Sequence, residues 1–382
     1  MNALLTQTIR ADREYAQLLD VAKKQFKAPK PLPILINGLC EGASDAMLVS
    51  LISDLPRKSS ALIICAEEKD CVRVNATLNR FGLRSAFFVG RDFTFYNITA
   101  SHEYEHERLD VLFGLLGDGL DAVVTTPDAA LGFTIPPERL AESVLRLDFD
   151  STVDLDDLTH RLVAAGYSRA DMVDGKGQFA VRGGIVDIYP PHGHYVDEDG
   201  GKQDGSMALR IELFGDEIDR MGLFDVESQR IHTTVMSVEL PPAREILIND
   251  ELRDALKKAI SAQFKTQHDE AVEQELIKEA AAVDLSRQTG GDIAFADKYI
   301  SLIYPEKNCL LDYFTDRSPV FLMGTNNVYE RLKASEWHRN QTIMELVEGG
   351  TIAPKYTQYA KPAASLDVFL ADNVTLHVDS MS

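Results

Sequence analysis

The chain has 382 residues, of which 45% are hydrophobic and 26% charged, a composition typical of a folded protein with two or three domains rather than a disordered chain. Its formal net charge of −21 argues against a protein that grips a nucleic acid backbone by itself, since that affinity depends largely on Lys and Arg. No apolar run reaches the length of a membrane span and the first residues lack the pattern of a secretion signal, so we expect a cytoplasmic protein without membrane contact.

The first part of the chain, up to about residue 147, alternates between helical and strand-like segments. The expected helices cover residues 13–26, 44–55, 69–81 and 105–116, and the expected strands cover residues 34–36, 61–66, 86–89 and 122–126. Short β-rich runs separated by helices predict a parallel sheet of the α/β class.

The pattern changes after Leu147, where an acidic helix at 155–165 leads into strand-like runs at 177–190 and 209–218. The segment 192–206 is rich in Gly, Asp and Glu, which predicts a mobile hairpin loop rather than a site. This middle unit ends near residues 241–242.

Helical sequence returns in the last part of the chain, from residue 250 to about 287. Short apolar runs at 302–304 and 319–323 follow, and we expect a strand there that rejoins the first sheet. Two further apolar runs, 368–370 and 374–378, precede the last residues.

Strand alternation divides the side chains of the middle unit between two faces. Leu209, Ile211 and Leu213 should point to the core, as should Phe179 and Val181. The opposite, outer face then carries Gln178, Arg182, Arg210, Glu212 and Phe214. Arginines that frame an exposed aromatic side chain suit a docking surface, although such a stripe is most often the solvated side of an antiparallel sheet.

A segment resembling a phosphate-binding loop lies at residues 38–45, between an apolar strand and a helix. Its side chains do not fit the chemistry, because Ser44 takes the place of the Lys, Asp45 takes that of the Thr, and Glu41 adds negative charge. We therefore predict a degenerate loop, with Gly38, Gly42, Ser44 and Asp45, that binds no nucleotide.

Three patterns suggest metal binding without completing a site. Residues 102–106 spell HExxH, which on a helix would place two imidazoles one turn apart, as in a zinc peptidase. Acidic neighbours make a solvated helix start the simpler interpretation. The pair His192 and His194 lacks a fixed third ligand, and the acidic run 216–219 fits a turn between strands. We predict no metal site and no catalytic residue, and keep a zinc hydrolase as an alternative.

The block 179–190, followed by 210–218 and 223–230, resembles the UvrA-binding domain that the excision-repair protein UvrB shares with bacterial transcription-repair coupling factors. The resemblance covers most of residues 25–380. It implies the N-terminal UvrB-like module of such a factor, in which a degenerate P-loop NTPase-like parallel sheet domain is interrupted by an inserted α+β domain. The implied domains are 1–147 and 246–382 for the α/β part and 148–245 for the insertion.

The resemblance also implies what the module binds. Its UvrA contacts would be Arg169, Gln178, Arg182, Arg210, Glu212 and Phe214, with Gln178 standing where UvrB has another Arg. We expect Arg182→Ala or Arg210→Ala to remove about 2 kcal/mol or more of UvrA binding and to leave the fold intact. The module itself would need no cofactor. RNA polymerase and DNA would be reached through further domains, where ATP and magnesium would drive a translocase.

Two departures separate the sequence from UvrB. The residues that match the acidic, magnesium-binding motif of UvrB are Met323 to Asn326, which contain no acidic pair, and the gap 91–106 is short for the aromatic hairpin that UvrB inserts there. Because of these departures, we keep an ATPase that clamps damaged DNA, as UvrB does, only as the alternative function.

Overall fold

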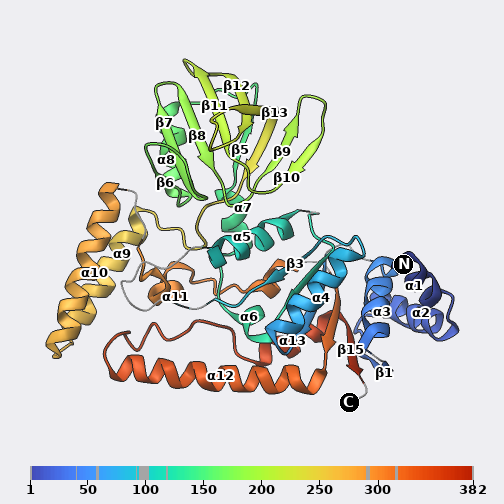
Figure 1. The fold of residues 1–382 in the computed structure, drawn as a ribbon. Helices are drawn as coiled ribbons and strands as arrows, with labels where there is room; N and C mark the ends of the chain where they lie inside the picture. The colour runs from blue at the N-terminus through green and yellow to red at the C-terminus, as the bar shows by residue number, and fades with distance from the viewer. Residues whose placement is uncertain are drawn as a thin grey trace.

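Two β-sheets of different construction organise the chain. A computed structural model describes residues 2–39, 41–56, 60–91, 93, 103–117, 119–289, 293–314 and 317–380. Within these residues, one sheet has six parallel strands and the other has nine strands, most of them antiparallel. Figure 1 shows the nine-stranded sheet, in green and yellow, above the parallel sheet.

The six parallel strands come from both ends of the sequence. In sheet order β1-β15-β14-β2-β4-β3, they are β1 (Ile34–Leu39), β15 (Val374–Ser380), β14 (Pro319–Met323), β2 (Ala61–Cys65), β4 (Ala122–Thr125) and β3 (Ser85–Phe88). Because β15 and β14 lie between β1 and β2, the end of the chain completes a sheet that its first part begins. The predicted α/β class and the return of residues 319–323 to the first sheet are confirmed.

Both faces of the parallel sheet are buried. In β2, Leu62 and Ile64 pack into one hydrophobic core while Ile63 and Cys65 pack into another, as expected for a strand covered by helices on both sides. The helices of this part are α1 (Asn2–Arg10), α2 (Arg13–Lys27), α3 (Glu41–Asp54), α4 (Glu68–Arg80), α5 (Glu103–Leu116), α6 (Pro127–Leu131), α7 (Pro137–Ser143), α12 (Thr325–Glu348) and α13 (Ala364–Asp372).

The second sheet forms from the middle of the sequence. Its order is β10-β9-β13-β12-β11-β8-β7-β6, with β5 also paired to β13. The strands are β5 (Leu145–Asp148), β6 (Ser168–Arg169), β7 (Gln178–Arg182), β8 (Ile185–Tyr189), β9 (His194–Asp197), β10 (Lys202–Asp204), β11 (Leu209–Phe214), β12 (Glu217–Phe224) and β13 (Ile231–Leu240). Helix α8 (Leu155–Ala164) packs on one face. Phe179, Leu209 and Ile211 are buried on that face, which confirms the predicted core side.

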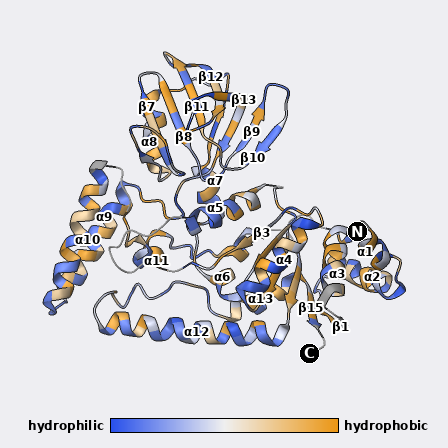
Figure 2. Ribbon diagram, viewed as in Figure 1, coloured by the Kyte–Doolittle hydropathy of each residue, from blue (hydrophilic) through white to orange (hydrophobic). Residues whose placement is uncertain are grey.

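A helical segment follows the second sheet. It contains α9 (Asp250–Phe264), α10 (Glu270–Thr289), the 3-10 helix η1 (Ala296–Tyr299), α11 (Ile300–Ile303) and the 3-10 helix η2 (Leu310–Tyr313). A buried ion pair between Lys298 Nζ and Glu279, at 2.8 and 3.0 Å, ties η1 to α10. Figure 2 shows hydrophilic and hydrophobic residues mixed along α10 and α12, as expected for helices with one exposed side.

The expected strand at residues 302–304 is wrong, because α11 ends at Ile303, and α1 was not predicted. The expected hairpin at 192–206 is present, but it contains the strands β9 and β10 instead of being a loop throughout, because β9 pairs with β13 and buries Tyr195. The expected helical region 250–287 is confirmed and consists of two helices, and the apolar run 368–370 lies within α13.

The predicted boundaries of the inserted domain stay a prediction, although β5 shows that the second sheet already includes Leu145. Among the described helices, none combines the length and apolar character needed to span a membrane.

Candidate functional site

The outer face of the second sheet brings three strands together in a fixed register. Across β7, β8 and β11, Ala180 pairs with Asp187 and Asp187 with Arg210. In the next row, Arg182 pairs with Ile185 and Ile185 with Glu212. A small apolar cluster of Val173, Ala180, Ala208 and Phe224 covers part of this face, so it is more than a solvated surface.

Asp187 lies at the centre of this face and is fully buried. Its Oδ2 atom accepts hydrogen bonds from Arg182 Nη2 at 2.5 Å and from Arg210 Nη2 at 2.9 Å, and its Oδ1 atom accepts one from Arg210 Nε at 2.6 Å. A buried carboxylate needs such partners, because removing a charge from water is costly. Sequence reasoning missed Asp187, although its position beside Arg182 and Arg210 follows once the strand register is known.

Arg210 is engaged within the sheet. Its side chain is only 12% exposed. Besides the bonds to Asp187, it donates to the backbone and side-chain oxygens of Gln229 at 3.1 and 2.8 Å, and its guanidinium lies 4.5 Å from the centre of the Phe224 ring. The hydrogen bonds to Asp187 raise the pKa of Arg210 above its ordinary value. We therefore revise the expectation that Arg210→Ala leaves the fold intact.

Phe214 and Glu212 lie at the end of β11. Phe214 is 81% exposed, the highest value among the large hydrophobic side chains of the described residues. It pairs with Glu217 across a two-residue turn that begins with Gly215, whose φ of 66° favours glycine. Glu212 is half-buried and pairs in register with Arg220. Phe214 is thus an apolar group held in solvent by a well-defined hairpin.

The other two predicted contact residues differ in their availability. Arg169 is exposed on the edge strand β6. Gln178 uses its side-chain oxygen within its own turn, where it accepts hydrogen bonds from the backbone N–H groups of Asp174 and Gly175 at 3.0 and 3.2 Å. Arg169 is therefore accessible to solvent, whereas Gln178 stabilises the loop before β7.

The predicted degenerate loop spans the end of β1 and the start of α3, because Gly38 lies in β1 whereas Gly42, Ser44 and Asp45 lie in α3. Gly38 has a φ of 84°, and α3 starts at Glu41, three residues earlier than predicted. Cys40 is outside the described residues, and Gly42 lies in the first turn of α3. Ser44 is buried, and both oxygens of Asp45 accept hydrogen bonds from Arg73 Nη1, at 3.0 and 2.8 Å. The Asp45 carboxylate is thus neutralised by α4.

An acidic residue does lie beside this loop, which the sequence match to Met323–Asn326 had missed. The neighbour of β1 is β15, and Asp379 of β15 pairs in register with Asn37. Asp379 Oδ1 accepts a hydrogen bond from Thr325 N at 2.8 Å, at the start of α12. The strand next to β1 therefore carries a carboxylate at its end, and this carboxylate is bonded to the first residue of α12.

Two of the three metal-like patterns have other partners, and the third, 216–219, lies in the turn before β12 and in the first residues of that strand. His102 is outside the described residues, and Glu105 accepts hydrogen bonds from Glu245 N and Arg244 Nη1. His192 Nδ1 pairs with Asp110 of α5, and His194 Nδ1 lies 2.7 Å from Asp204 Oδ1. In the described part of the chain, no group of three or more His, Cys, Asp or Glu side chains is arranged to hold a metal ion.

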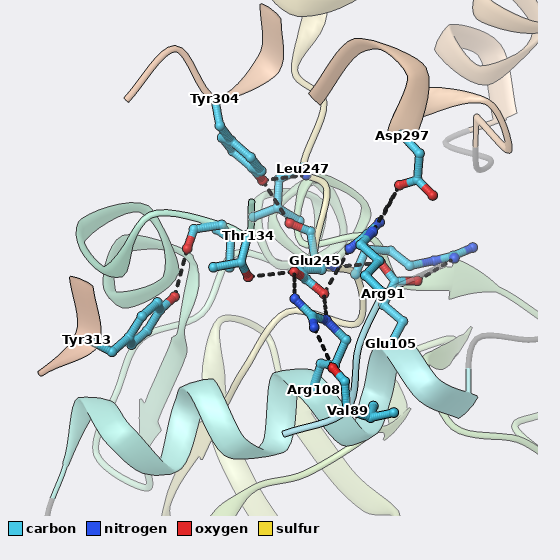
Figure 3. A network of polar contacts seen from close by, with 12 residues as sticks. Val89, Arg91, Glu105, Arg108, Thr134, Glu245, Leu247, Asp297, Tyr304 and Tyr313 are labelled. Carbon is cyan, nitrogen blue, oxygen red and sulfur yellow. Dashed lines mark hydrogen bonds and ion pairs between the residues drawn. The ribbon is translucent and has the colours of Figure 1, made fainter. Parts of the chain in front are cut away.

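A buried polar network fixes the segment that leaves the second sheet (Figure 3). Glu245, just after β13, accepts two hydrogen bonds from Arg108 of α5, at 2.8 and 2.9 Å, and one from Thr134 Oγ1 at 2.5 Å. Arg91 Nη1 lies 2.8 Å from Glu245 Oε2, and Arg91 Nη2 donates to Asp297 at 2.5 Å. Burial alone would raise the pKa of Glu245, but Arg108 and Arg91 outweigh it and hold that pKa below its ordinary value.

This network joins three separate parts of the sequence. Arg91 and Arg108 come from the first α/β segment, Glu245 from the end of the insertion, and Asp297 from the later helical segment. A second contact comes from Phe113 of α5, whose ring stacks on His194 with the centres 4.5 Å apart. The Glu245 network and the Phe113–His194 contact therefore attach the second sheet to the parallel-sheet domain.

Comparison with known proteins places the second sheet in a recognised class. Residues 145–246 match the family model of the UvrB interaction domain. This range includes every strand of the second sheet, β5 to β13, and the linker that carries Glu245.

Over about two thirds of its length, the chain is similar to transcription-repair-coupling factors. The chain is 30% identical over 262 residues to that of Bacillus subtilis, covering 66% of this chain and 21% of the relative. It is 26% identical over 266 residues to that of Staphylococcus haemolyticus, covering 68% of this chain and 22% of the relative. The predicted resemblance to the N-terminal UvrB-like module of transcription-repair-coupling factors is confirmed. The chain spans about a fifth of the length of these curated relatives.

Proposed function

We propose that this chain is a module that recruits UvrA in transcription-coupled repair, and that it acts by binding rather than by catalysis. The observation that carries the proposal is the exposure of Phe214 and Arg182 on the outer face of the sheet that matches the UvrB interaction domain. Exposed aromatic and Arg side chains are typical energetic centres of protein interfaces.

The predicted contact residues take different roles in this proposal. Phe214 would be the apolar anchor, Arg182 and Arg169 would bind carboxylates of UvrA, and Glu212 would meet a basic group. Arg210 and Gln178 would hold the face in shape, because their polar atoms already have partners within the sheet.

The whole protein would do more than this module. By analogy with the relatives, further domains would contact RNA polymerase and DNA and would use ATP and magnesium to move along DNA. The module itself would use no cofactor, since Asp45 is paired with Arg73 at the position where a nucleotide loop needs a hydroxyl group.

Calorimetric titration with purified UvrA tests the proposal. We expect saturable binding that Arg182→Ala and Phe214→Ala each weaken, while Arg146→Ala leaves it unchanged. Arg146 is a matched control, because it is an exposed arginine of the same sheet that is bonded to Glu239. Absence of binding by the folded wild-type chain would overturn the proposed function.

A UvrB-like ATPase is the second candidate, favoured by the strand-loop-helix setting of β1 and α3 and by the nearby carboxylate of Asp379. Titration with a fluorescent ATP analogue separates the two candidates. Saturable, magnesium-dependent binding would favour the ATPase, and we expect none.

A further inference from the structure

Two arginines share one buried carboxylate on the outer face, but they share it unequally. Asp187 binds Arg210 through both oxygens and Arg182 through Oδ2 alone. Formally the three groups carry a net charge of +1, because two guanidinium groups face one carboxylate. One positive charge is therefore left uncompensated within this trio, and its location decides which arginine a partner can use.

Arg210 does not present the uncompensated positive charge at the surface. Its hydrogen bonds go to Asp187 and Gln229, and Phe224 covers its guanidinium. Gln229 is itself fixed, because it adopts a φ of 59° in a turn and its side chain donates to Val226 O at 2.8 Å. Turning Arg210 toward a partner would break these bonds and leave Asp187 with one cation.

Arg182 is the exposed member of the pair. Its side chain is 44% exposed, and Nη2 makes its hydrogen bond to Asp187. Within the described residues, the Nε and Nη1 atoms of Arg182 make no hydrogen bond, so two donor groups face solvent from a guanidinium that is held at one end. The backbone is also held, because Leu213 N donates a hydrogen bond to Gly184 O at 2.7 Å in the turn that follows Arg182.

We infer that Asp187 is the positioning residue of the UvrA-binding face. It holds the Arg182 guanidinium so that Nη1 faces a carboxylate of the partner, while Arg210 supplies the second cation on Asp187 without touching the partner. Holding a long side chain in place before binding lowers the entropy that binding must cost. This inference rests on the proposed function, since it names the chemical group that the same face would recognise.

A double-mutant cycle measures whether Asp187 acts through Arg182. We expect Asp187→Asn to weaken UvrA binding about tenfold, the factor that corresponds to ordering one long side chain. In the Arg182→Ala background, Asp187→Asn should change the affinity by less than about twofold. Equal weakening in both backgrounds would mean a merely structural role and would overturn the inference. Asp199→Asn, in the exposed turn between β9 and β10, is the control for loss of one negative charge.

A second measurement needs neither a variant nor UvrA. Nitrogen-15 relaxation of arginine Nε groups in the free wild-type chain reports how ordered each guanidinium is. We expect Arg182 to be nearly as ordered as Arg210 and much more ordered than Arg169. Disorder of Arg182 equal to that of Arg169 would overturn the inference even if Asp187→Asn fails to fold.

The two proposals can fail separately. If the wild-type chain does not bind UvrA but Arg182 is ordered, the proposed function is wrong and the positioning of Arg182 by Asp187 stands. If UvrA binds and Arg182 is disordered, the function stands and the role of Asp187 is wrong.

Discussion

The edge of the parallel sheet at β1 and the outer face of the second sheet both have the geometry of a binding site. They differ in whether their side-chain groups are already bonded within the protein or remain available to a partner. At β1, the charged groups of Asp45 and Asp379 are bonded to Arg73 and to the start of α12. On the second sheet, Phe214 is exposed and Arg182 retains donors that face solvent. Architecture alone therefore does not identify a site, and exposed groups with unused bonding capacity are the better guide.

The largest expected effect comes from the buried polar network around Glu245, which connects the second sheet to the parallel-sheet domain. Glu245→Ala leaves Arg91 and Arg108 buried without their shared carboxylate, so we expect the free energy of unfolding to fall by about 3–5 kcal/mol. Chemical denaturation measures this loss. Glu306→Ala removes a carboxylate from an exposed pair with Arg139 and should cost less than about 1 kcal/mol. Equal effects of the two variants would contradict the role of the network.

Arg210→Ala should separate stability from binding on the outer face. Removing Arg210 leaves the buried Asp187 with Arg182 alone, so we expect a loss of stability of about 2–3 kcal/mol. Arg182→Ala should cost less than about 1 kcal/mol, since Arg182 is partly exposed and Arg210 still neutralises Asp187. Thermal unfolding of both variants, with Arg146→Ala as the control, checks the order. A more stable Arg210→Ala than Arg182→Ala would reverse our assignment.

Acid should weaken the contribution of Glu245. Its pKa is held below its ordinary value of 4.5, so the stability that the ionised group provides is fully present above about pH 4.5 and is lost as the pH falls through its lower folded-state pKa. We therefore expect the stability difference between wild type and Glu245→Gln to shrink as the pH drops below about 4.5. A difference that grows on acidification would contradict the direction of this shift.

The smallest expected effects lie at the degenerate loop. Asp45→Ala breaks a partly exposed ion pair with Arg73 and should change stability by less than about 1 kcal/mol. Neither the wild type nor this variant should bind a fluorescent ATP analogue in the presence of magnesium. If the wild type bound the ATP analogue and Asp45→Ala abolished that binding, the contrast between the two regions would be wrong.

Much of the fold could be predicted because local patterns carry it. The apolar runs of β2 and β4 are typical of strands buried on both faces, and the helix before each strand marks a parallel sheet. The run 302–304 was misread because a short apolar segment looks the same in a strand and in a helix. The strand pair β9 and β10 was missed because its Gly- and Asp-rich turn dominates the composition.

The candidate site could be predicted only in part. Strand alternation assigned Arg182, Arg210 and Phe214 to one face, and the exposure of Phe214 agrees with that assignment. The two arginines differ in exposure and in their hydrogen bonds to Asp187. Asp187 lies 23 residues before Arg210 in the sequence and contacts it only through the pairing of β8 with β11. Strand register between distant segments is not a local property, so sequence patterns alone do not supply it.

The most direct test of the account is calorimetric titration of UvrA with the wild-type chain and with the double variant Arg182→Ala/Phe214→Ala. We predict saturable binding by the wild type and a loss of at least about 2 kcal/mol of binding free energy in a double variant that remains folded. Binding of unchanged affinity by that folded double variant would contradict the claim that the outer face of the second sheet recruits UvrA.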